Sequence, residues 1–556
     1  MILQQVATVL GLLIVYRLYS NWKQLSHAPG PLIGALTDSW RAYQQFNGNL
    51  RNELIRLHSV HGPVVRYGVR SVSISDPSVV DVVYGSRAGF TTADSYNVLV
   101  GISNGKEVAS LVSTRDETRH GALRRSVASA FTPTGVLDYE PWIDESIVEL
   151  LDVLSERPSI DLSSTMLYYS MDAAGRFSFG EPLGCLRADA DIGGNAQMIR
   201  NRFNHWGWWS SLPALERLIY RNPIALRMKR APSSMAASAV AKMKARAGKP
   251  SNSSQAPDLL SRFLESSKIN PEVLDSAGIV GMLMSTISGA GDTTATSTTA
   301  ILYYLLKHRD KLTKLRSELV VAGINETLPS NRDVSKLPYL HAVIREGMRL
   351  FPTITWPIER CVPKGGAIIA GMHFPEGTSV GCMPAALHLN PAVFGEDARE
   401  YRPERWLVAE PEVLRKMESS HMGLSRGRRV CLGQHIAMMQ MKKVVAAMVL
   451  NFDETKQNSI LTLPSGQTVN VKSETSLDVD EIPIIDVSAI WSDEIEAKKA
   501  IAEQIREACH RIGFFYAQHP GIDPKFAKQA FEQGKRFCAL PMERKLEVDT
   551  KLVPNG

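Results

Sequence analysis

Cys431 lies in a segment whose residue types could support metal chemistry, LSRGRRVCLG (residues 424–433). A long apolar run, QHIAMMQMKKVVAAMVL (434–450), follows it and predicts a helix. The glycines allow a close backbone approach to a flat ligand. A helix N-terminus and nearby arginines favour a thiolate, which is suited to binding iron. The alternative is a small buried apolar residue, which a lone cysteine at such a position more often is.

An acid and a hydroxyl lie next to each other inside a long apolar helix predicted from about Asp275 to Lys307. They are Asp292 and Thr293, in the segment GAGDTT (289–294). Burying such groups in a core helix is costly unless they serve a purpose. The alternative for Thr293 is a hydroxyl that bonds back to its own helix.

Charged residues at helical spacing form two further candidate groups. Glu346 and Arg349, in EGMR, are three apart and can pair on one helix face, although such pairs usually lie on the surface. His120 and Arg124, in HGALRR, are four apart and point the same way, whereas Arg125 should diverge.

The composition of the whole chain is that of a globular protein. It has 556 residues, of which 44% are hydrophobic and 22% charged, so collagen, general disorder and a multi-span membrane protein are excluded. A net charge of +6 over this length does not require nucleic acid as a partner. Six scattered cysteines without a CxxC pair do not form a disulfide scaffold or a structural zinc site.

The amino-terminal segment predicts a membrane anchor over residues 1–26. Ile2 to Tyr19 is mainly apolar, and Arg17 and Lys23 come after its apolar core rather than before it. By the positive-inside rule, the expected topology is a single-pass anchor in the endoplasmic reticulum membrane with a cytosolic body. The alternative is an amphipathic or buried first helix.

The elements that must position the candidate residues are mostly helices. From Arg115 to about Arg349 the apolar spacing is helical, and His61 to Val83 predicts a short β-meander before it. Asn204 to Leu212 contains three tryptophans in four positions. They predict either ordinary core packing or a substrate mouth or bilayer contact.

The segment around Cys431 resembles the haem-binding loop of the cytochrome P450 superfamily. Gly427, Arg429, Cys431 and Gly433 match its pattern, and Leu424 stands where a Phe is expected. The resemblance covers roughly residues 28–455 and is strongest to fungal enzymes similar to pisatin demethylase. It implies a mainly α fold with small β-sheets, with a haem domain at residues 27–457.

The same resemblance implies roles for the other candidates. Haem b is held by Cys431 as axial ligand of the iron, and its propionates by His120, Arg124, Arg360 and Arg429. Asp292 relays protons and Thr293 holds dioxygen by a hydrogen bond. Glu346 and Arg349 lock onto Arg405 of the segment YRPERW in a buried charged triad.

The resemblance also implies partners. NADPH supplies two electrons through a separate NADPH-cytochrome P450 reductase, because the chain has no Gly-rich dinucleotide fold. A basic patch of Arg426, Arg428, Lys442 and Lys443 is expected to meet the acidic surface of that reductase. The substrate is a lipophilic small molecule, oxidised with O2 in fungal secondary metabolism.

Residues 458–556 resemble the amino-terminal segment of 2-oxoglutarate and iron(II) dependent dioxygenases. The matching pieces are EIPIIDVSAIW, EACHRIGFFYAQHPGI and ALPMERK. Nothing after Asp486 supplies the HxD of an iron-binding triad, so an incomplete α/β appendage without a second active site is expected. The resemblance to cytochromes P450 also implies a β-hairpin after the cysteine helix, and this tail is expected to replace it. An inactive fusion or mis-joined gene product with a binding or scaffold role is therefore the alternative function.

Overall fold

The computed structural model describes residues 2–103, 105–157, 159–228, 233–246, 256–454, 460–462, 468–472, 484–492, 494–511, 516–519, 521, 529 and 532. These residues divide into two compact units, residues 1–472 and residues 473–556. The first unit is mainly helical with small sheets, as the sequence predicts.

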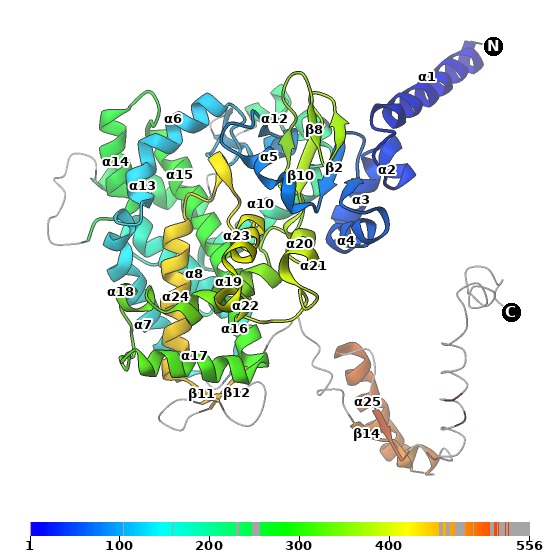
Figure 1. Cartoon of the computed structure of the whole chain (residues 1–556). Coiled ribbons are helices and arrows are strands. Elements are labelled where there is room, and N and C mark those ends of the chain that lie inside the picture. The colour runs from blue at the N-terminus through cyan, green and yellow to red at the C-terminus, as the bar shows by residue number, and fades with distance from the viewer. Residues whose placement is uncertain are drawn as a thin grey trace. The chain divides into compact units, whose positions relative to one another are not determined.

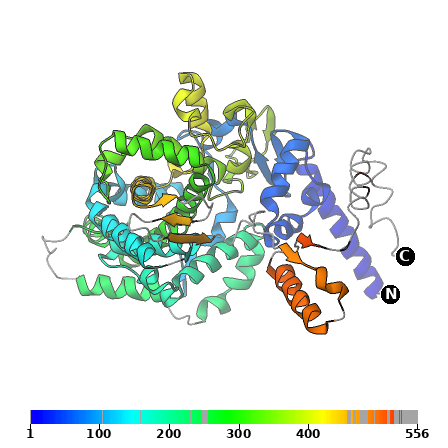
Figure 2. The same ribbon diagram turned by 90° about the horizontal axis from the view of Figure 1, so that it is seen from below.

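The core of the first unit consists of long helices packed side by side. In Figures 1 and 2, α24 (Gln434–Asn451) runs through the middle of this unit, among the helices that surround it. Its main neighbours are α7 (Glu140–Glu156), α16 (Ala295–Lys307), α17 (Arg309–Val321), α18 (Asn331–Val334) and α19 (Pro338–Leu350). The helix α8 (Leu162–Phe179) packs in turn against α7, α16 and α15 (Ser276–Gly289). The Asp161 side chain caps the start of α8, and Gly180 ends this helix in the left-handed conformation.

Shorter helices complete the first unit. Before α8 they are α2 (Leu32–Leu36), α3 (Ser39–Phe46), α4 (Leu50–His61), α5 (Val80–Tyr84) and α6 (Glu117–Val127). Between α8 and α15 they are α9 (Cys185–Ala188), α10 (Asn195–Trp209), α11 (Pro213–Tyr220), α12 (Pro223–Arg227), α13 (Ser234–Arg246) and α14 (Leu259–Ile269). The later ones are α18 (Asn331–Val334), α20 (Pro384–Leu387), α21 (Pro391–Phe394), α22 (Arg405–Val408) and α23 (Pro411–Ser420).

A five-stranded sheet holds segments that are far apart in the sequence. Its order is β1 (Val64–Arg66), β2 (Ser71–Ile74), β10 (Ser379–Cys382), β7 (Arg360–Cys361) and β3 (Thr91–Thr92). The β2–β10 pair is parallel, and the other pairs are antiparallel. The predicted β-meander ends after β2, because Asp76 accepts a hydrogen bond from the Ser78 N–H and begins a helical turn that leads into α5.

Smaller sheets lie at the edges of the first unit. Two are hairpins, β4 (Gly101–Ser103) with β5 (Lys106–Val108), and β8 (Ala367–Ile369) with β9 (Met372–Phe374). The third has four strands in the order β11 (Asp453–Glu454), β12 (Ile460–Thr462), β13 (Thr468–Lys472) and β6 (Ser159–Asp161). The backbone after α24 therefore returns to the first unit up to Lys472, past the boundary at residue 457 that the sequence predicts.

The second unit contains a small α/β element. Strands β14 (Ile484–Asp486) and β15 (Tyr516–Gln518) pair in parallel, and α25 (Ile495–Arg511) lies between them in the sequence. Ile485, Val487 and Ile501 form its buried apolar cluster. Most of the predicted matches beyond residue 518 lie outside the described residues.

The predictions of a transmembrane anchor and of a location in the endoplasmic reticulum membrane are wrong. The first helix, α1 (Ile2–Gln24), forms as a single helix and extends away from the rest of its unit in Figure 1. Across the described residues, however, no helix is both long enough and apolar enough to cross a membrane. The apolar core of α1 is too short, because Gln4 and Gln5 precede it and Arg17 follows it.

Candidate functional site

The loop before α24 holds Cys431 in a fixed backbone conformation. The Cys431 N–H donates to the carbonyl oxygen of Leu424 at 2.9 Å, and the Val430 N–H donates to that of Gly427 at 3.1 Å. Gly427 has φ +68°, and a Cβ atom there would lie 1.7 Å from the carbonyl oxygen of Tyr84. Glycine is thus required at position 427, because both its φ and its contact with α5 exclude a side chain.

The Cys431 thiol is accessible at the surface of the first unit. Its side chain is exposed, yet burial by the surrounding protein raises the pKa of the thiol. The Gly433 N–H and the charge of Arg124 act in the opposite direction and favour the thiolate.

Four basic side chains lie close to the Cys431 loop. Arg124, on α6, donates to the carbonyl oxygen of Val430 at 2.8 Å. Arg429 donates to the carbonyl oxygen of Thr114 and to the Oε1 atom of Glu117, each at 2.8 Å. Arg360 begins β7, with its guanidinium 5.1 Å from the ring centre of Tyr84. His120 is buried on α6, one turn before Arg124, whereas Arg125 is exposed as expected.

The electrostatics of this group suit an anionic ligand. Burial and then the positive charge of Arg429 lower the pKa of His120 to about 4. Burial lowers the pKa of Arg124 and of Arg429. The positive charge of Arg429 also lowers the pKa of Arg124, and that of Arg360 also lowers the pKa of Arg429. Within the described residues, Glu117 is the one carboxylate bonded to these four side chains. An exposed thiol beside a basic cluster matches the donors that a haem and its two propionates need.

A π-helical segment interrupts the long helix that carries Asp292 and Thr293. Residues Ala290–Thr294 form this segment between α15 and α16, in place of the uninterrupted helix that the sequence predicts. Gly291 packs against α8, because a Cβ atom there would lie 2.9 Å from the Met171 side chain. Single π-helical turns within α-helices are frequent at functional sites, since they open the backbone hydrogen-bond ladder.

Thr293 and Asp292 are both half-buried on the π-helical segment. The Thr293 hydroxyl donates to the carbonyl oxygen of Gly289 at 2.6 Å, which is the back-bonded arrangement considered as an alternative. Burial raises the pKa of Asp292, and the charge of Arg200 on α10 opposes this shift. Asp292 is therefore more readily protonated than an ordinary aspartate in water, and the Thr293 oxygen can still accept a hydrogen bond.

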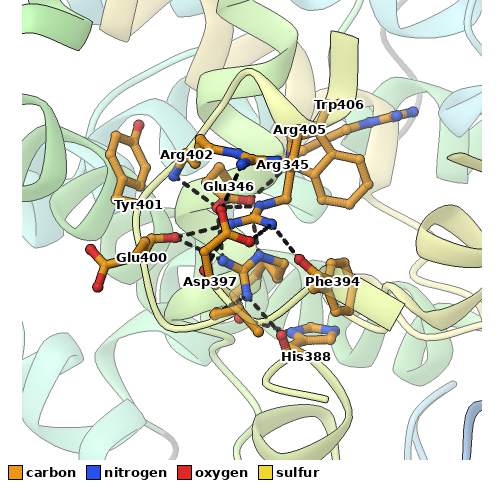
Figure 3. Close-up of polar contacts among 12 residues, drawn as sticks. Arg345, Glu346, His388, Phe394, Asp397, Glu400, Tyr401, Arg402, Arg405 and Trp406 are labelled. Carbon is orange, nitrogen blue, oxygen red and sulfur yellow. Dashed lines mark hydrogen bonds and ion pairs between the residues drawn. The ribbon is translucent and has the colours of Figure 1, made fainter. Parts of the chain in front are cut away.

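Glu346, Arg349 and Arg405 lie together in a fully buried cluster. Figure 3 shows Glu346 and Arg405 with the residues around them. The Glu346 Oε1 atom is 2.7 Å from the Arg349 Nη2 atom and 2.9 Å from the Arg405 Nε atom. Its Oε2 atom accepts from the Trp406 indole at 2.9 Å. Both arginines also donate to backbone carbonyl oxygens around the cluster, which satisfies the remaining N–H groups.

Lys443 does not belong to the basic patch predicted around the Cys431 loop. This side chain is buried, and its Nζ atom lies 2.5 Å from the Oε1 atom of Glu140 and 2.7 Å from the Oδ1 atom of Asp144, both on α7. Lys443 therefore ties α24 to α7 and is not available to a partner. Arg426 and Lys442 are half-buried and Arg428 is exposed, so these three remain candidates for a partner surface.

Several residues around the site were not singled out in the sequence. Glu117 pairs with Arg429, and Tyr84 lies against both Gly427 and Arg360. Glu359 forms a buried ion pair with Arg41 at 3.0 Å, next to Arg360 in the sequence. Only Glu117 could have been found from local sequence, because it lies about one turn before His120 on the same helix, α6. The other contacts join segments hundreds of residues apart, which no spacing rule reveals.

The three clustered tryptophans have different environments. Trp206 is buried, and its ring lies 5.2 Å from that of Trp356 and 5.3 Å from that of Tyr96. Trp208 is 42% exposed and lies 5.4 Å from the ring of Phe46. Core packing therefore accounts for Trp206, and Trp208 lies at the surface.

Two family models match the chain. One, described as cytochrome P450, matches residues 28–477. The other, described as the N-terminal part of a non-haem dioxygenase in morphine synthesis, matches residues 482–555.

Among curated proteins, the chain is 32% identical to the cytochrome P450 monooxygenase pkfB of Emericella nidulans, over 81% of this chain and 91% of that protein. A cytochrome P450 monooxygenase of Aspergillus terreus is also 32% identical, with coverage of 82% and 95%. The cytochrome P450 monooxygenase mpaDE of Penicillium brevicompactum is 32% identical over 80% of this chain. The chain spans only 54% of mpaDE, about half of its length.

Among solved structures, a crystal structure of the cytochrome P450 CYP102L1 aligns with a TM-score of 0.60. The alignment covers 76% of this chain and 92% of the other, at 19% sequence identity. At this identity the match shows the fold alone.

Proposed function

Because this chain belongs to the cytochrome P450 family of monooxygenases over residues 28–477, we propose that it oxidises a lipophilic small molecule with O2 through a haem bound at Cys431. The observation that carries the proposal is the exposed thiol of Cys431 beside the basic cluster of Arg124, Arg360, Arg429 and His120. Haem, when bound through a thiolate, activates O2 for insertion into unreactive C–H bonds.

The residues around the thiol would hold the cofactor. The Gly433 N–H and the charge of Arg124 favour the anionic sulfur that ligation needs, against the effect of burial on the thiol pKa. The carbonyl oxygen of Leu424 fixes the Cys431 backbone by accepting its N–H. Arg124, Arg360 and Arg429 would bind the propionates by charge-assisted hydrogen bonds.

The π-helical segment would deliver protons to the site. Burial raises the pKa of Asp292, which favours its protonated form as a proton donor, and the charge of Arg200 opposes this shift. The Thr293 hydroxyl, donating to the Gly289 carbonyl oxygen, leaves its oxygen free to accept a hydrogen bond. We propose that Asp292 passes protons inward and that Thr293 orients them at the reacting oxygen.

The character of α15 supports a lipophilic substrate. Its sequence, SAGIVGMLMSTISG, is mainly apolar, so a substrate that contacts it exchanges water for apolar surface. The curated relatives come from fungi, and we propose a role in fungal secondary metabolism for this chain as well.

Electrons would come from NADPH through a separate reductase. The sequence has no Gly-rich dinucleotide fold, so this chain is proposed to receive electrons from a partner. Arg426, Arg428 and Lys442 are proposed to form the basic surface that meets an acidic patch on that partner.

The alternative of an inactive scaffold rested partly on a hairpin missing after α24. Strands β12 and β13 form an antiparallel pair at this point of the chain, which removes that reason. The monooxygenase therefore remains the function that the geometry supports best.

The test is the carbon monoxide difference spectrum of the purified, reduced full chain. We expect the red-shifted Soret band of thiolate-ligated haem, and its loss in Cys431→Ser. The matched control is Cys361→Ser, a half-buried cysteine on β7. A wild-type chain without haem, or an unchanged spectrum in Cys431→Ser, would reject the proposal. Substrate-dependent NADPH consumption with added reductase then separates an active from an inactive enzyme.

A further inference from the structure

The carbonyl oxygen of Arg349 lies in the last turn of α19, where the hydrogen bonds of the helix leave it without a partner. The helix ends at Leu350, and the Phe351 N–H bonds back to Gly347. The His388 Nδ1 atom lies 2.9 Å from the Arg349 carbonyl oxygen and donates its proton to it. In return, the His388 carbonyl oxygen accepts from the Arg349 Nη1 atom at 2.7 Å. His388 is thus fixed to the end of α19, at the edge of the cluster drawn in Figure 3.

The other ring nitrogen of His388 holds the segment that leads to Cys431. Its Nε2 atom accepts from the Met422 N–H at 2.8 Å. Because a backbone N–H can only donate, the two partners together assign the neutral ring with its proton on Nδ1. Complete burial lowers the pKa of His388 well below its usual value, which agrees with this neutral form. The imidazole therefore joins α19 to Met422 through two hydrogen bonds.

Two backbone hydrogen bonds connect Met422 with the Cys431 backbone. The Met422 carbonyl oxygen accepts from the Ser425 N–H at 2.9 Å and closes a turn. Within this turn, the Leu424 carbonyl oxygen accepts from the Cys431 N–H at 2.9 Å. The Met422 side chain is buried in an apolar cluster, which fixes the start of the turn as well. A shift of Met422 would therefore move the Leu424 carbonyl group and, with it, Cys431.

A second imidazole supports the same segment. His421 stacks on His388, with ring centres 5.0 Å apart and planes 16° apart. Its Nε2 atom lies 3.2 Å from the carbonyl oxygen of Arg345, one turn before Arg349 on α19. A Cβ atom at Gly423 would lie 2.8 Å from the His421 ring. Residues 421–423 are therefore packed closely against the two imidazoles that α19 holds.

We propose that His388 is a positioning residue for the Cys431 thiolate, because its Nε2 atom holds the Met422 N–H and thereby keeps the loop in the conformation that presents the sulfur to haem iron. This inference rests on the proposed function, because it requires haem at Cys431. His388 would act through Met422 and Leu424, without touching the haem. Without the imidazole acceptor, the buried Met422 N–H would have no partner, and the segment would gain free energy by moving towards water.

The test compares two substitutions at position 388 in the full-length holoprotein. In His388→Asn, the side-chain amide can still donate to the Arg349 carbonyl oxygen but is too short to reach the Met422 N–H. In His388→Gln, the longer side chain places its carbonyl oxygen near the position of Nε2, where it can accept this N–H. We expect the red-shifted Soret band of the reduced, carbon monoxide-bound protein to decay roughly tenfold faster in His388→Asn than in the wild type. His388→Gln should keep most of the wild-type lifetime.

The matched control is His61→Asn, at an exposed position at the end of α4, and it should match the wild type. Faster decay in His388→Asn alone, or failure of this variant alone to bind haem, supports the inference. Equal decay in His388→Asn and the wild type overturns it. An equal defect in both variants also overturns it, because this would indicate general loosening around the ring.

Hydrogen exchange at the Met422 amide is the second measurement, and it needs neither variant. We expect slow exchange in the wild-type holoprotein, since this N–H is buried and bonded. Fast exchange at this amide would overturn the inference even if the Soret bands behaved as expected. A wild-type protein without the red-shifted band would instead reject the proposed function.

Discussion

At the scale of single residues, the site combines groups that are each unremarkable in the sequence. The Cys431 pKa is raised by burial, so the sulfur depends on the Gly433 N–H and on Arg124 to become a thiolate. Thr293 donates to its own helix. Their chemistry follows from where the backbone places them rather than from unusual side chains.

Thr293→Val tests whether the hydroxyl matters beyond its bond to Gly289. Valine has nearly the same shape but cannot donate or accept, so we expect the product formed per NADPH consumed to fall by roughly tenfold. The substrate-induced spectral change should persist, because binding does not need the hydroxyl. Thr293→Ser retains the donor and should recover most of the product yield. Equal coupling in the valine and serine variants would contradict the proposed role.

His421 and His388 make the stability of the folded chain depend on pH. Their rings stack 5.0 Å apart, and burial lowers the pKa of His421 to about 4 and that of His388 well below its usual value. In the unfolded chain both take up protons below about pH 6.5. The unfolded state therefore binds more protons, and stability is lost as the pH falls from about 6.5 towards 4.

The expected loss in the free energy of unfolding is about 1.4 kcal/mol per pH unit for each of these histidines. Urea unfolding of the full chain at several pH values between 7 and 5 measures the slope. His421→Gln keeps a donor for the carbonyl oxygen of Arg345 but removes the titration, so its slope should be smaller by about one proton. A slope identical to that of the wild type would show that His421 is not responsible.

At the scale of elements, buried charges fix helices to one another. Lys443 joins α24 to α7 through Glu140 and Asp144, and Glu346 joins α19 to α22 through Arg405. These pairs are buried, so removing Lys443 or Glu346 would leave the charges that it contacts less well compensated.

Adjacent lysines on α24 should respond differently to charge reversal. Lys442→Glu changes a half-buried position, so haem content should stay normal while electron transfer from the reductase slows several-fold. Lys443→Glu places a third acid against Glu140 and Asp144 and should greatly reduce the yield of folded protein. Stopped-flow reduction and haem content per chain measure the two effects. Normal folding of the Lys443 variant would contradict the buried position.

Glu346→Gln tests the cluster shown in Figure 3. The change removes the carboxylate that Arg349 and Arg405 share, so Arg349 loses its ion-pair partner and Arg405 keeps only Asp397. We expect a loss of about 3–5 kcal/mol in the free energy of unfolding. Urea unfolding measures it. Glu400→Gln is the matched control, because this exposed residue contributes only its carbonyl oxygen to the cluster. A similar small loss in both variants would contradict a role for the Glu346 charge.

At the scale of the whole molecule, the first unit should fold without the second if the chain is cut after β13. A chain of residues 1–477 keeps β12 and β13. These two strands pair with each other, and β13 also pairs with β6, which precedes α8. We expect it to bind haem like the full chain. A chain of residues 1–457 loses both strands, and its thermal midpoint should be lower by several degrees. Equal midpoints for the two truncated chains would show that the strands contribute nothing.

Local patterns predicted the helical body and many of the candidate residues, because helical periodicity and short motifs involve residues that are close together in the sequence. They failed for α1, where a short apolar core resembled a membrane span although polar residues lie within a few positions of it. They also failed for Lys443, because a charge on an amphiphilic helix does not reveal which face is buried. Contacts such as Tyr84 with Gly427 join distant segments, and a single sequence contains no signal for them.

The close approach of Tyr84 to Gly427 has a genetic consequence. Any replacement at codon 427 must displace α5 or the cysteine loop, because a methyl group would overlap the Tyr84 carbonyl oxygen. Even alanine, usually the mildest substitution, would be expected to behave as a loss-of-function allele. Strains carrying missense changes at this codon should therefore show the phenotype of a gene deletion.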